Sequence, residues 1–334
     1  MKILVTGGLG FIGSHTVVEL LDANYDVVVV DDLSNSTIDV KDKIEKITGK
    51  TFKYYEVNVC NEEKMDEIFK NEKVDAVIHF AGYKAVGESV AKPLMYYENN
   101  LLSTIVLIKT MEKYGVNNFV FSSSATVYGS PKSLPIEEDF PLSTTNPYGT
   151  TKLFIERIIE DVCVANPNFS AVVLRYFNPI GAHKSGLIGE NPVGIPNNLM
   201  PYIVRVADKQ LKELSVFGND YDTHDGTGVR DYIHVVDLAK GHLKAIEKAD
   251  KSKGVMFYNL GTGTGYSVLD LVETFKRVNG VDVPYKIVDR RPGDIAACYA
   301  DPKKAYEELG WKAELGIEEM CKDSYNYILK SREK

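Results

Sequence analysis

The hydrophobic pattern of the first half alternates short apolar runs with longer stretches of mixed polarity. Runs of consecutive valine and isoleucine are typical of strands buried on both faces, as in a parallel sheet. The intervening stretches are long enough for crossover helices. This pattern predicts an α/β fold with a doubly wound, parallel, Rossmann-type sheet, whose ligands gather at the carboxyl ends of the strands. The expected strands lie at residues 3–5, 26–30, 52–56, 76–79 and 118–122, and two of the expected helices at 14–23 and 61–70.

The pattern changes after about residue 180. Glycine, proline and asparagine cluster in residues 181–201, and shorter strands and helices are expected from there to the end of the chain. The 334 residues fit two domains at ~100–200 residues each. We therefore expect a first domain over residues 1–180 and a smaller C-terminal α/β lobe over residues 181–334, which binds the substrate. Some strands and helices of the second part are expected to return to the first.

Composition and net charge exclude several classes of protein for this sequence. Hydrophobic residues make up 44% of the chain and charged residues 26%, as in an ordinary globular protein. A net charge of −8 argues against a nucleic-acid binder with a basic face, but not against a small anionic ligand. The four cysteines are isolated, so neither a disulfide scaffold nor a metal site is expected. No apolar run approaches the ~18 residues of a membrane span, and no signal peptide is recognisable. We expect a cytoplasmic protein that does not contact a membrane.

A glycine-rich turn follows the first expected strand. Gly7, Gly10 and Gly13 have the spacing G-x-x-G-x-x-G and open the first helix, where backbone amides are available to a pyrophosphate. Alone, the spacing fits an ordinary strand-to-helix turn equally well. Asp31, at the end of the second strand, lies where a carboxylate accepts both hydroxyls of an adenosine ribose. Because a carboxylate would repel a 2′-phosphate, the pattern favours NAD over NADP.

Two further strand ends carry residues with open roles. Asn58 follows the third strand, and it is either a contact to the adenine ring or a polar turn residue. His79 lies within an apolar strand, so we interpret it as a core histidine and not as a catalytic one. The small residues at 81–82 would let the chain approach a cofactor closely.

The candidate chemistry lies on a helix that Asn146 and Pro147 are expected to start. Tyr148 and Lys152 are four residues apart and share a helix face. An ammonium group at this spacing is expected to lower the tyrosine pKa from ~10, so that the phenolate acts as a general base. Such a pair alone is a frequent coincidence among 20 tyrosines. Ser124, at the end of the fifth strand, adds a hydroxyl that shares the substrate proton.

In this order, these features resemble the UDP-glucose (UDP-galactose) 4-epimerase family of extended short-chain dehydrogenases/reductases. The resemblance covers essentially the whole chain. Its most specific segments are TGGLGFIGSH at 6–15, HFAGYKAVGES at 79–89, FSSSATVYG at 121–129, NPYGTTK at 146–152, LRYFNPIGAH at 174–183 and GIPNNLMPYI at 194–203.

The resemblance implies interconversion of UDP-glucose and UDP-galactose. In the family, the sugar is oxidised transiently at C4 by tightly bound NAD, and the 4-keto sugar turns over before the hydride returns. Tyr148 would be the base, Ser124 would bind the reacting hydroxyl, and Lys152 would bind the nicotinamide ribose. A homodimer, formed through helices at the sheet edge, is also implied.

The resemblance further assigns two sets of binding residues. The cofactor set comprises Gly7, Gly10, Phe11, Ile12, Gly13, Asp31, Asn35, Ser36, Asn58, Phe80, Ala81, Gly82, Lys84, Asn99, Tyr148, Lys152 and Phe177. The nucleotide-sugar set comprises Ser124, Tyr148, Asn178, Asn198, Leu199, Phe217, Arg230, Arg291, Asp294 and Cys298. Within the second set, the two arginines can fork onto a diphosphate, and the aspartate can accept the uridine ribose hydroxyls.

Two positions depart from many family members. Asn58 replaces an aspartate, but its carbonyl still accepts a hydrogen bond from the adenine amine. Cys298 stands where some members have a bulky tyrosine, and in the family a small residue there accompanies acceptance of N-acetylated sugars. We therefore extend the expected substrates to UDP-GlcNAc and UDP-GalNAc.

Two alternative functions are weighed against the epimerase. A nucleotide-sugar 4,6-dehydratase on the same scaffold would need an acid pair beside Ser124, but Ala125 and Thr126 follow it. A non-catalytic NAD-binding sensor would be expected to lack Tyr148 or Lys152, and both are present.

Overall fold

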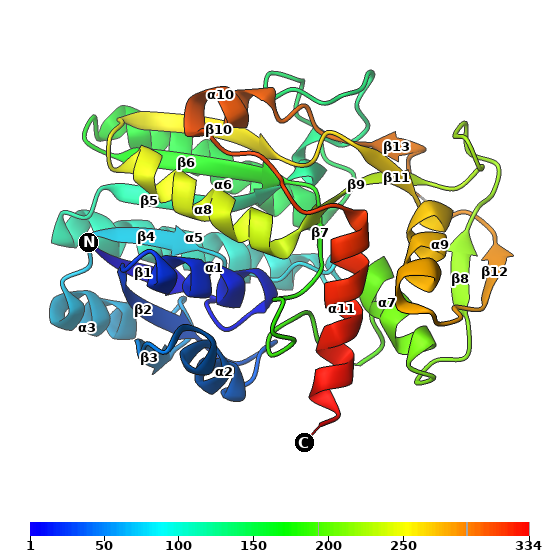
Figure 1. Ribbon diagram of the computed structural model, residues 1–334. Helices are drawn as coiled ribbons and strands as arrows, with labels where there is room; N and C mark the ends of the chain where they lie inside the picture. The colour runs from blue at the N-terminus through cyan, green and yellow to red at the C-terminus, as the bar shows by residue number, and fades with distance from the viewer. Residues whose placement is uncertain (193, 292, 334) are drawn as a thin grey trace.

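The computed structural model describes residues 1–192, 194–291 and 293–333. Its centre is a seven-stranded sheet with the strand order β10-β6-β5-β4-β1-β2-β3, in which every neighbouring pair is parallel (Figure 1). The doubly wound parallel sheet is thus confirmed. Its strands are β1 (Lys2–Thr6), β2 (Asp26–Asp31), β3 (Lys53–Glu56), β4 (Ala76–His79), β5 (Asn118–Ser124), β6 (Ser170–Tyr176) and β10 (Gly254–Leu260).

Helices cover both faces of this sheet. One face is covered by α1 (Phe11–Asp22), α2 (Asp39–Thr48), α8 (Val235–Ala249) and α10 (Lys303–Leu309). The other is covered by α3 (Glu62–Glu72), α5 (Pro93–Tyr114) and α6 (Pro147–Ala165), with the short α4 (Val86–Ala91) beside them. Because successive side chains of a strand point to opposite faces, β2 supplies both cores. Val27 and Val29 lie in the first, and Val28 and Val30 in the second.

The smaller lobe has a core of its own. Strand β9 (Val229–His234) is central, and it pairs with β7 (Asn178–Ile180), β11 (Gly265–Ser267) and β13 (Ala297–Cys298). A separate pair joins β8 (Leu214–Phe217) to β12 (Tyr285–Val288). Helices α7 (Leu199–Ala207), α9 (Val268–Asn279) and α11 (Ile317–Ser331) pack against these strands. After β9, the chain returns through α8 and β10 to the main sheet (Figure 1).

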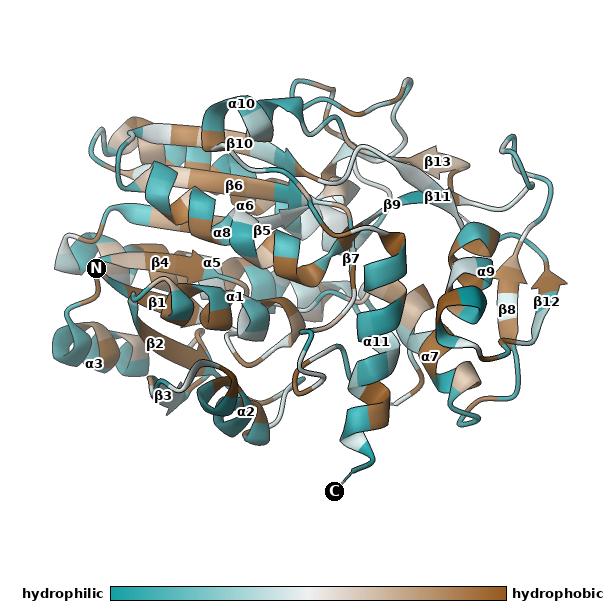
Figure 2. Cartoon of the chain, viewed as in Figure 1, coloured by the Kyte–Doolittle hydropathy of each residue, from teal (hydrophilic) through white to brown (hydrophobic). Residues whose placement is uncertain are grey.

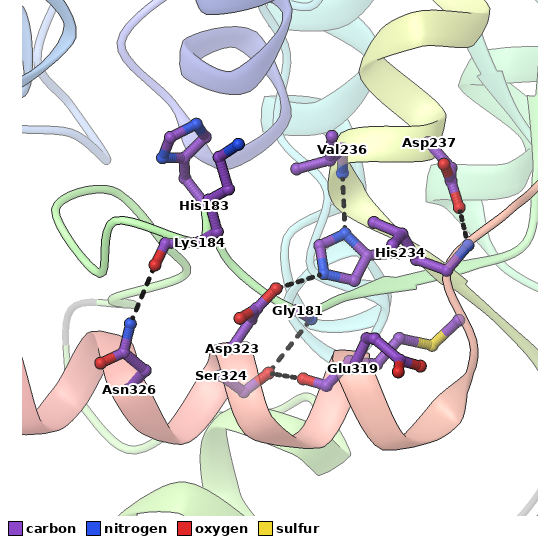
Figure 3. A network of polar contacts seen from close by, with 12 residues as sticks. Gly181, His183, Lys184, His234, Val236, Asp237, Glu319, Asp323, Ser324 and Asn326 are labelled. Atoms are coloured by element: carbon purple, nitrogen blue, oxygen red, sulfur yellow. Dashed lines mark hydrogen bonds and ion pairs between the residues drawn. The ribbon is translucent and has the colours of Figure 1, made fainter. Parts of the chain in front are cut away.

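Helix α11 is fixed by polar contacts to the strands beside it (Figure 3). The fully buried His234 accepts a hydrogen bond at Nδ1 from the Val236 amide, 3.1 Å away, and its Nε2 lies 3.2 Å from the Asp323 carboxylate. The Ser324 hydroxyl accepts a hydrogen bond from the Gly181 amide at 3.1 Å. These contacts fix the start of the segment that leads from β7 towards α7.

Hydrophobic and hydrophilic residues are distributed over the same layers. Figure 2 shows hydrophobic colour along strands β2 and β6 and hydrophilic colour on α2, α3 and much of α11. In the described part of the chain, no helix combines the length and apolar character that a membrane crossing would require.

Candidate active site

The glycine turn packs tightly against the end of β4. Gly7 has a φ of +67°, and a Cβ on it would lie 2.9 Å from the Ala81 nitrogen. A Cβ on Gly13 would lie 2.2 Å from the Gly7 carbonyl oxygen. Helix α1 begins after Gly10, and among the described residues no side chain caps that start. The first amides of α1 are therefore left for an anionic ligand, as a pyrophosphate cradle requires.

Asp31 ties the end of β2 to the glycine turn. Its carboxylate accepts hydrogen bonds from the Leu9 and Leu33 amides, both at 3.0 Å, and from the Ser36 hydroxyl at 2.8 Å. Asp31 and Ser36, both predicted for the cofactor, are thus in direct contact, and Asn35 lies exposed between them along the chain.

Asn58 makes contacts typical of a turn residue. Its Oδ1 accepts a hydrogen bond from the Cys60 amide at 2.9 Å, and its Nδ2 donates to the Asp32 carboxylate at 2.8 Å. The turn role is confirmed, and a contact to adenine stays a prediction.

His79 is confirmed as a core histidine. Its ring nitrogens form hydrogen bonds with the hydroxyls of Thr6, at 2.7 Å, and Thr104, at 3.1 Å. Burial lowers the pKa of His79 to about 3, so the ring is neutral at physiological pH.

One acidic residue that sequence reasoning missed joins the two sets of predicted ligands. Glu190 Oε1 lies 3.2 Å from the Lys84 ammonium and accepts a hydrogen bond from Asn198 Nδ2 at 2.9 Å. Lys84, predicted for the cofactor, also lies 6.0 Å from the ring centroid of Phe11 on α1. Asn198, predicted for the sugar nucleotide, precedes α7. An acid in a glycine- and proline-rich segment gives no periodic signal, so sequence alone does not single it out.

Other predicted cofactor residues surround the same strand ends. Phe80 follows β4, and its ring lies 4.6 Å from that of His242 on α8. Gly82 packs closely against the side chain of Asn100. The Asn100 Oδ1 accepts a hydrogen bond from Asn99 Nδ2 at 3.1 Å.

Helix α6 begins as the sequence predicts. Asn146 is its N-cap, accepting a hydrogen bond from the Gly149 amide at 2.9 Å, and Pro147 occupies the first helical position. Tyr148 and Lys152 are both buried on the helix face that meets the end of β5. The Lys152 ammonium donates to the Ser122 carbonyl oxygen at 2.8 Å and lies 5.9 Å from the centroid of the Tyr148 ring.

The tyrosine and the strand-end serine form the expected contact. Burial raises the pKa of Tyr148 to about 12, and a hydrogen bond with the Ser124 hydroxyl acts in the opposite direction. Ser124 is held in turn by the Thr126 amide at 3.3 Å and the Thr126 hydroxyl at 3.1 Å. The predicted net lowering of the Tyr148 pKa is therefore not found in the structure, because desolvation is the largest effect on this group. Burial also lowers the pKa of Lys152 to about 8, against the effect of Glu156.

Most of the predicted nucleotide-sugar residues lie in the smaller lobe, on or near β7, α7, β8, β9 and β13, whereas Ser124 and Tyr148 lie at the end of β5 and the start of α6. The Arg291 guanidinium lies 4.7 Å from the Phe217 ring centroid, and its Nε donates to Asp294 at 2.9 Å. Arg230 donates to the carbonyl oxygens of its neighbour in β9, at 2.8 Å, and of residue 295, at 3.0 Å. Cys298 is the register partner of Arg230. Asn178 starts β7 and Leu199 starts α7.

A small apolar cluster links Cys298 to the catalytic strand. Cys298 packs against a cluster that includes Val127, which lies three residues after Ser124, and Phe177, which follows β6. Burial raises the pKa of the Cys298 thiol to about 11, so it is a neutral, compact side chain.

Among the residues that the structure describes, those directly after Ser124 do not offer the acid pair of a dehydratase. The residues that follow it, Ala125–Tyr128, form a 3-10 helix without a carboxylate. The nearby Glu156 is already bound by Ser123 and Arg175.

Residues 4–324 match the family described as GDP-mannose 4,6 dehydratase. The UDP-glucose 4-epimerase of Bacillus subtilis (strain 168) is 61% identical over 327 residues, which cover 98% of this chain and 96% of that protein. Human UDP-glucose 4-epimerase is 55% identical over 333 residues, covering 98% and 96%. The crystal structure of UDP-glucose 4-epimerase from Bifidobacterium longum in complex with NAD+ and UDP is similar over 99% of this chain and 98% of that chain, with a TM-score of 0.96 and 58% identity.

Proposed function

Because the chain belongs to the UDP-glucose 4-epimerase family, we infer that it interconverts UDP-glucose and UDP-galactose with NAD as its cofactor. The observation that carries this conclusion is the contact of Tyr148 with Ser124 at the end of β5, with Lys152 buried one helical turn away. A dehydratase lacks support at this site, and a non-catalytic sensor would have no use for the buried pair.

The residues of the first domain fit NAD. The start of α1 has no side-chain cap from any described residue, so its backbone amides are available to a pyrophosphate. Gly7 and Gly13 are packed so closely that a side chain at either position would clash with the backbone of the turn or of the residues after β4. Asp31, held by two amides, is oriented for a ribose diol, and Lys152 is placed for the nicotinamide ribose. When bound, NAD supplies a cationic ring that favours the tyrosine phenolate and that takes and returns a hydride at the sugar carbon.

We assign the proton transfers to Tyr148. Its phenolate oxygen removes the proton of the C4 hydroxyl, and the phenol gives it back after the sugar has turned over. Ser124, held by Thr126, fixes the direction of the tyrosine hydroxyl and binds the reacting oxygen. Because Tyr148 and Ser124 are buried, water is excluded from the site where the proton is transferred.

The smaller lobe holds the UDP part in this proposal. Arg230 and Arg291 bind the diphosphate, Asp294 binds the uridine ribose, and the Phe217 ring packs beside Arg291. Residues 1–180 then carry NAD and the chemistry, and residues 181–334 carry most of the contacts to UDP. Anchoring through the nucleotide leaves the sugar free to present either face to the same base.

An assay with purified protein tests the function. Incubation with UDP-galactose, without added NAD, should yield UDP-glucose detectable by NMR, because the cofactor is regenerated and stays bound. Tyr148→Phe should abolish turnover while leaving UDP binding largely intact. Failure of the wild type even with added NAD would exclude the epimerase function.

A second substrate pair is favoured by Cys298. Its small side chain packs against the cluster that includes Val127 and Phe177. A tyrosine ring at this position would occupy the space needed by an N-acetyl group. We expect turnover of UDP-GlcNAc and UDP-GalNAc as well. Cys298→Tyr should lower activity on these substrates selectively, and equal activity on both pairs in that variant would contradict the role of Cys298.

The proposed assembly is a homodimer, formed through α5 and α6. Leu94, Leu102 and Ile105 on α5 and Phe154 on α6 are large apolar side chains exposed on two helices that pack together. A second copy of the chain would cover them. Multi-angle light scattering should give twice the mass of 37.2 kDa.

With a net charge of −8 and four free cysteines, the protein is proposed to act in the cytoplasm without nucleic acid.

A further inference from the structure

The last three residues of β5 each contact a different residue of α6. Lys152 donates to the Ser122 carbonyl oxygen at 2.8 Å, and the Ser123 hydroxyl donates to Glu156 Oε1 at 2.5 Å. The Ser124 hydroxyl is hydrogen-bonded to Tyr148. The three α6 partners are four residues apart, so they lie on one face of the helix, one turn after another. The run of serines therefore aligns α6 along β5, with Glu156 as its third contact.

Glu156 is bound from the opposite side by an arginine of β6. Its Oε1 lies 3.1 Å from Arg175 Nε, and its Oε2 lies 2.7 Å from Arg175 Nη2. Both side chains are 3% exposed or less. Arg175 Nη1 also donates to the Tyr128 hydroxyl and to the Glu138 carbonyl oxygen, both at 3.0 Å. A bidentate buried pair of this kind fixes the position of the helix, because neither partner could form hydrogen bonds with water if the pair were broken.

We propose that Glu156 is a positioning residue of the reaction, which holds α6 against β5 and β6 so that Tyr148 and Lys152 meet the strand-end serines. Its negative charge also favours the ammonium form of Lys152, one turn away. This inference rests on the proposed function, because it assigns Glu156 to the proton transfer at Tyr148.

The charged and titratable groups around Lys152 support the second role. On α6 they are Tyr148 and Glu156, and on β4 the neutral His79 faces it. Glu156 in turn faces Arg175 on β6. Tyr148 contributes to raising the pKa of Tyr176, which follows Arg175 on that strand, and that of Tyr96 on α5, although burial is the larger cause for both. Burial lowers the pKa of Lys152, and the Glu156 carboxylate opposes this effect. Loss of the carboxylate should therefore make Lys152 lose its proton at a lower pH.

The test compares Glu156→Gln with a matched control, Glu72→Gln. Glu72 is a buried glutamate of α3 that binds Lys2, Lys53 and Tyr55 at the far edge of the sheet. Each protein is assayed for UDP-galactose epimerisation across pH, thermal unfolding and the amount of NAD that copurifies. Glu156→Gln should lower kcat roughly tenfold to a hundredfold with little change in KM, and the alkaline limb of the kcat profile should move down by about one pH unit. Glu72→Gln should lower the unfolding temperature only.

Further variants separate charge from folding. If Glu156→Gln does not fold, the double variant Glu156→Leu with Arg175→Met replaces the pair by apolar side chains of similar volume, and it should show the same displaced pH limb. Glu156→Asp keeps the charge, so it should keep the wild-type limb at a lower kcat. A wild-type kcat and pH profile in folded Glu156→Gln or in the double variant would overturn the proposal, as would equal kinetic changes in Glu72→Gln. Absence of turnover in the wild type would refute the proposed function instead.

Discussion

Lys84 and Glu190 form an ion pair of 3.2 Å although they are 106 residues apart in the chain. Because Glu190 also accepts a hydrogen bond from Asn198, one carboxylate connects a residue proposed for NAD with one proposed for the UDP-sugar. Glu190→Gln would keep an acceptor for Asn198 but remove the charge that holds Lys84. We expect the KM for UDP-galactose to rise a few-fold with a smaller change in kcat, measured by steady-state kinetics.

Glu213→Gln is a suitable control for that prediction. Glu213 pairs with Lys286 at 2.8 Å on the surface of the smaller lobe, so its loss should leave both constants unchanged. An unchanged KM in Glu190→Gln would show that the contact of Glu190 with Lys84 and Asn198 has no part in substrate binding.

Lys152→Met should displace the pH optimum upwards. Burial already raises the pKa of Tyr148 to about 12, and removal of the neighbouring ammonium takes away a charge that stabilises the phenolate. The variant should therefore be weakly active near neutrality and recover part of its kcat as the pH rises. A kcat profile from pH 6 to 10 checks this, and a flat profile would contradict the role of the ammonium.

Gly13→Ala should abolish retention of NAD. A Cβ at this position would lie 2.2 Å from the Gly7 carbonyl oxygen, so the glycine turn would have to open. Gly87→Ala in α4 is the control, because no neighbouring atom of the described residues would lie within 4 Å of the added methyl group. The measurement is the molar ratio of NAD to protein after purification. Equal ratios in both variants would exclude the turn as the pyrophosphate site.

Three of the buried histidines, His15, His79 and His242, should make the protein sensitive to acid. Burial lowers the pKa of His15 and His79 to about 3 and that of His242 to about 4. Since the unfolded chain takes up these protons near pH 6.5, the free energy of unfolding should be greatest above that pH. It should fall as the pH decreases towards 4, by about 1.4 kcal/mol per pH unit for each histidine.

Chemical unfolding between pH 7 and 5 measures this slope. His79→Asn removes one of the three groups, so its free energy of unfolding should depend less steeply on pH than that of the wild type. An identical slope would mean that His79 is already protonated in the folded protein.

The sequence predicts the strands better than the contacts between elements. The valine run of β2 and the glycine turn are local patterns, and the structure has them where they are expected. Ser122 and Ser123 are also visible in the sequence, but their partners on α6 depend on how that helix packs against β5. Periodicity does not contain this information, which is why only Ser124 is singled out.

The same limit applies to electrostatics. The Tyr148–Lys152 spacing predicts an effect of charge, and the structure adds the larger effect of desolvation, which depends on surrounding residues from several elements. Glu190 is missed for a related reason, because its two partners come from distant segments.

The return of β10 to the main sheet has a consequence for any attempt to divide the chain. β10 pairs with β6 along seven register positions, from Ser170 to Tyr176, and without it β6 would be an edge strand. A fragment that stops at residue 180 would expose the backbone donors and acceptors of β6, a largely apolar strand. Such an exposed edge pairs readily with strands of other molecules. The two lobes are therefore expected to be synthesised, folded and degraded as one cooperative unit, and the fragment to be recovered as aggregate.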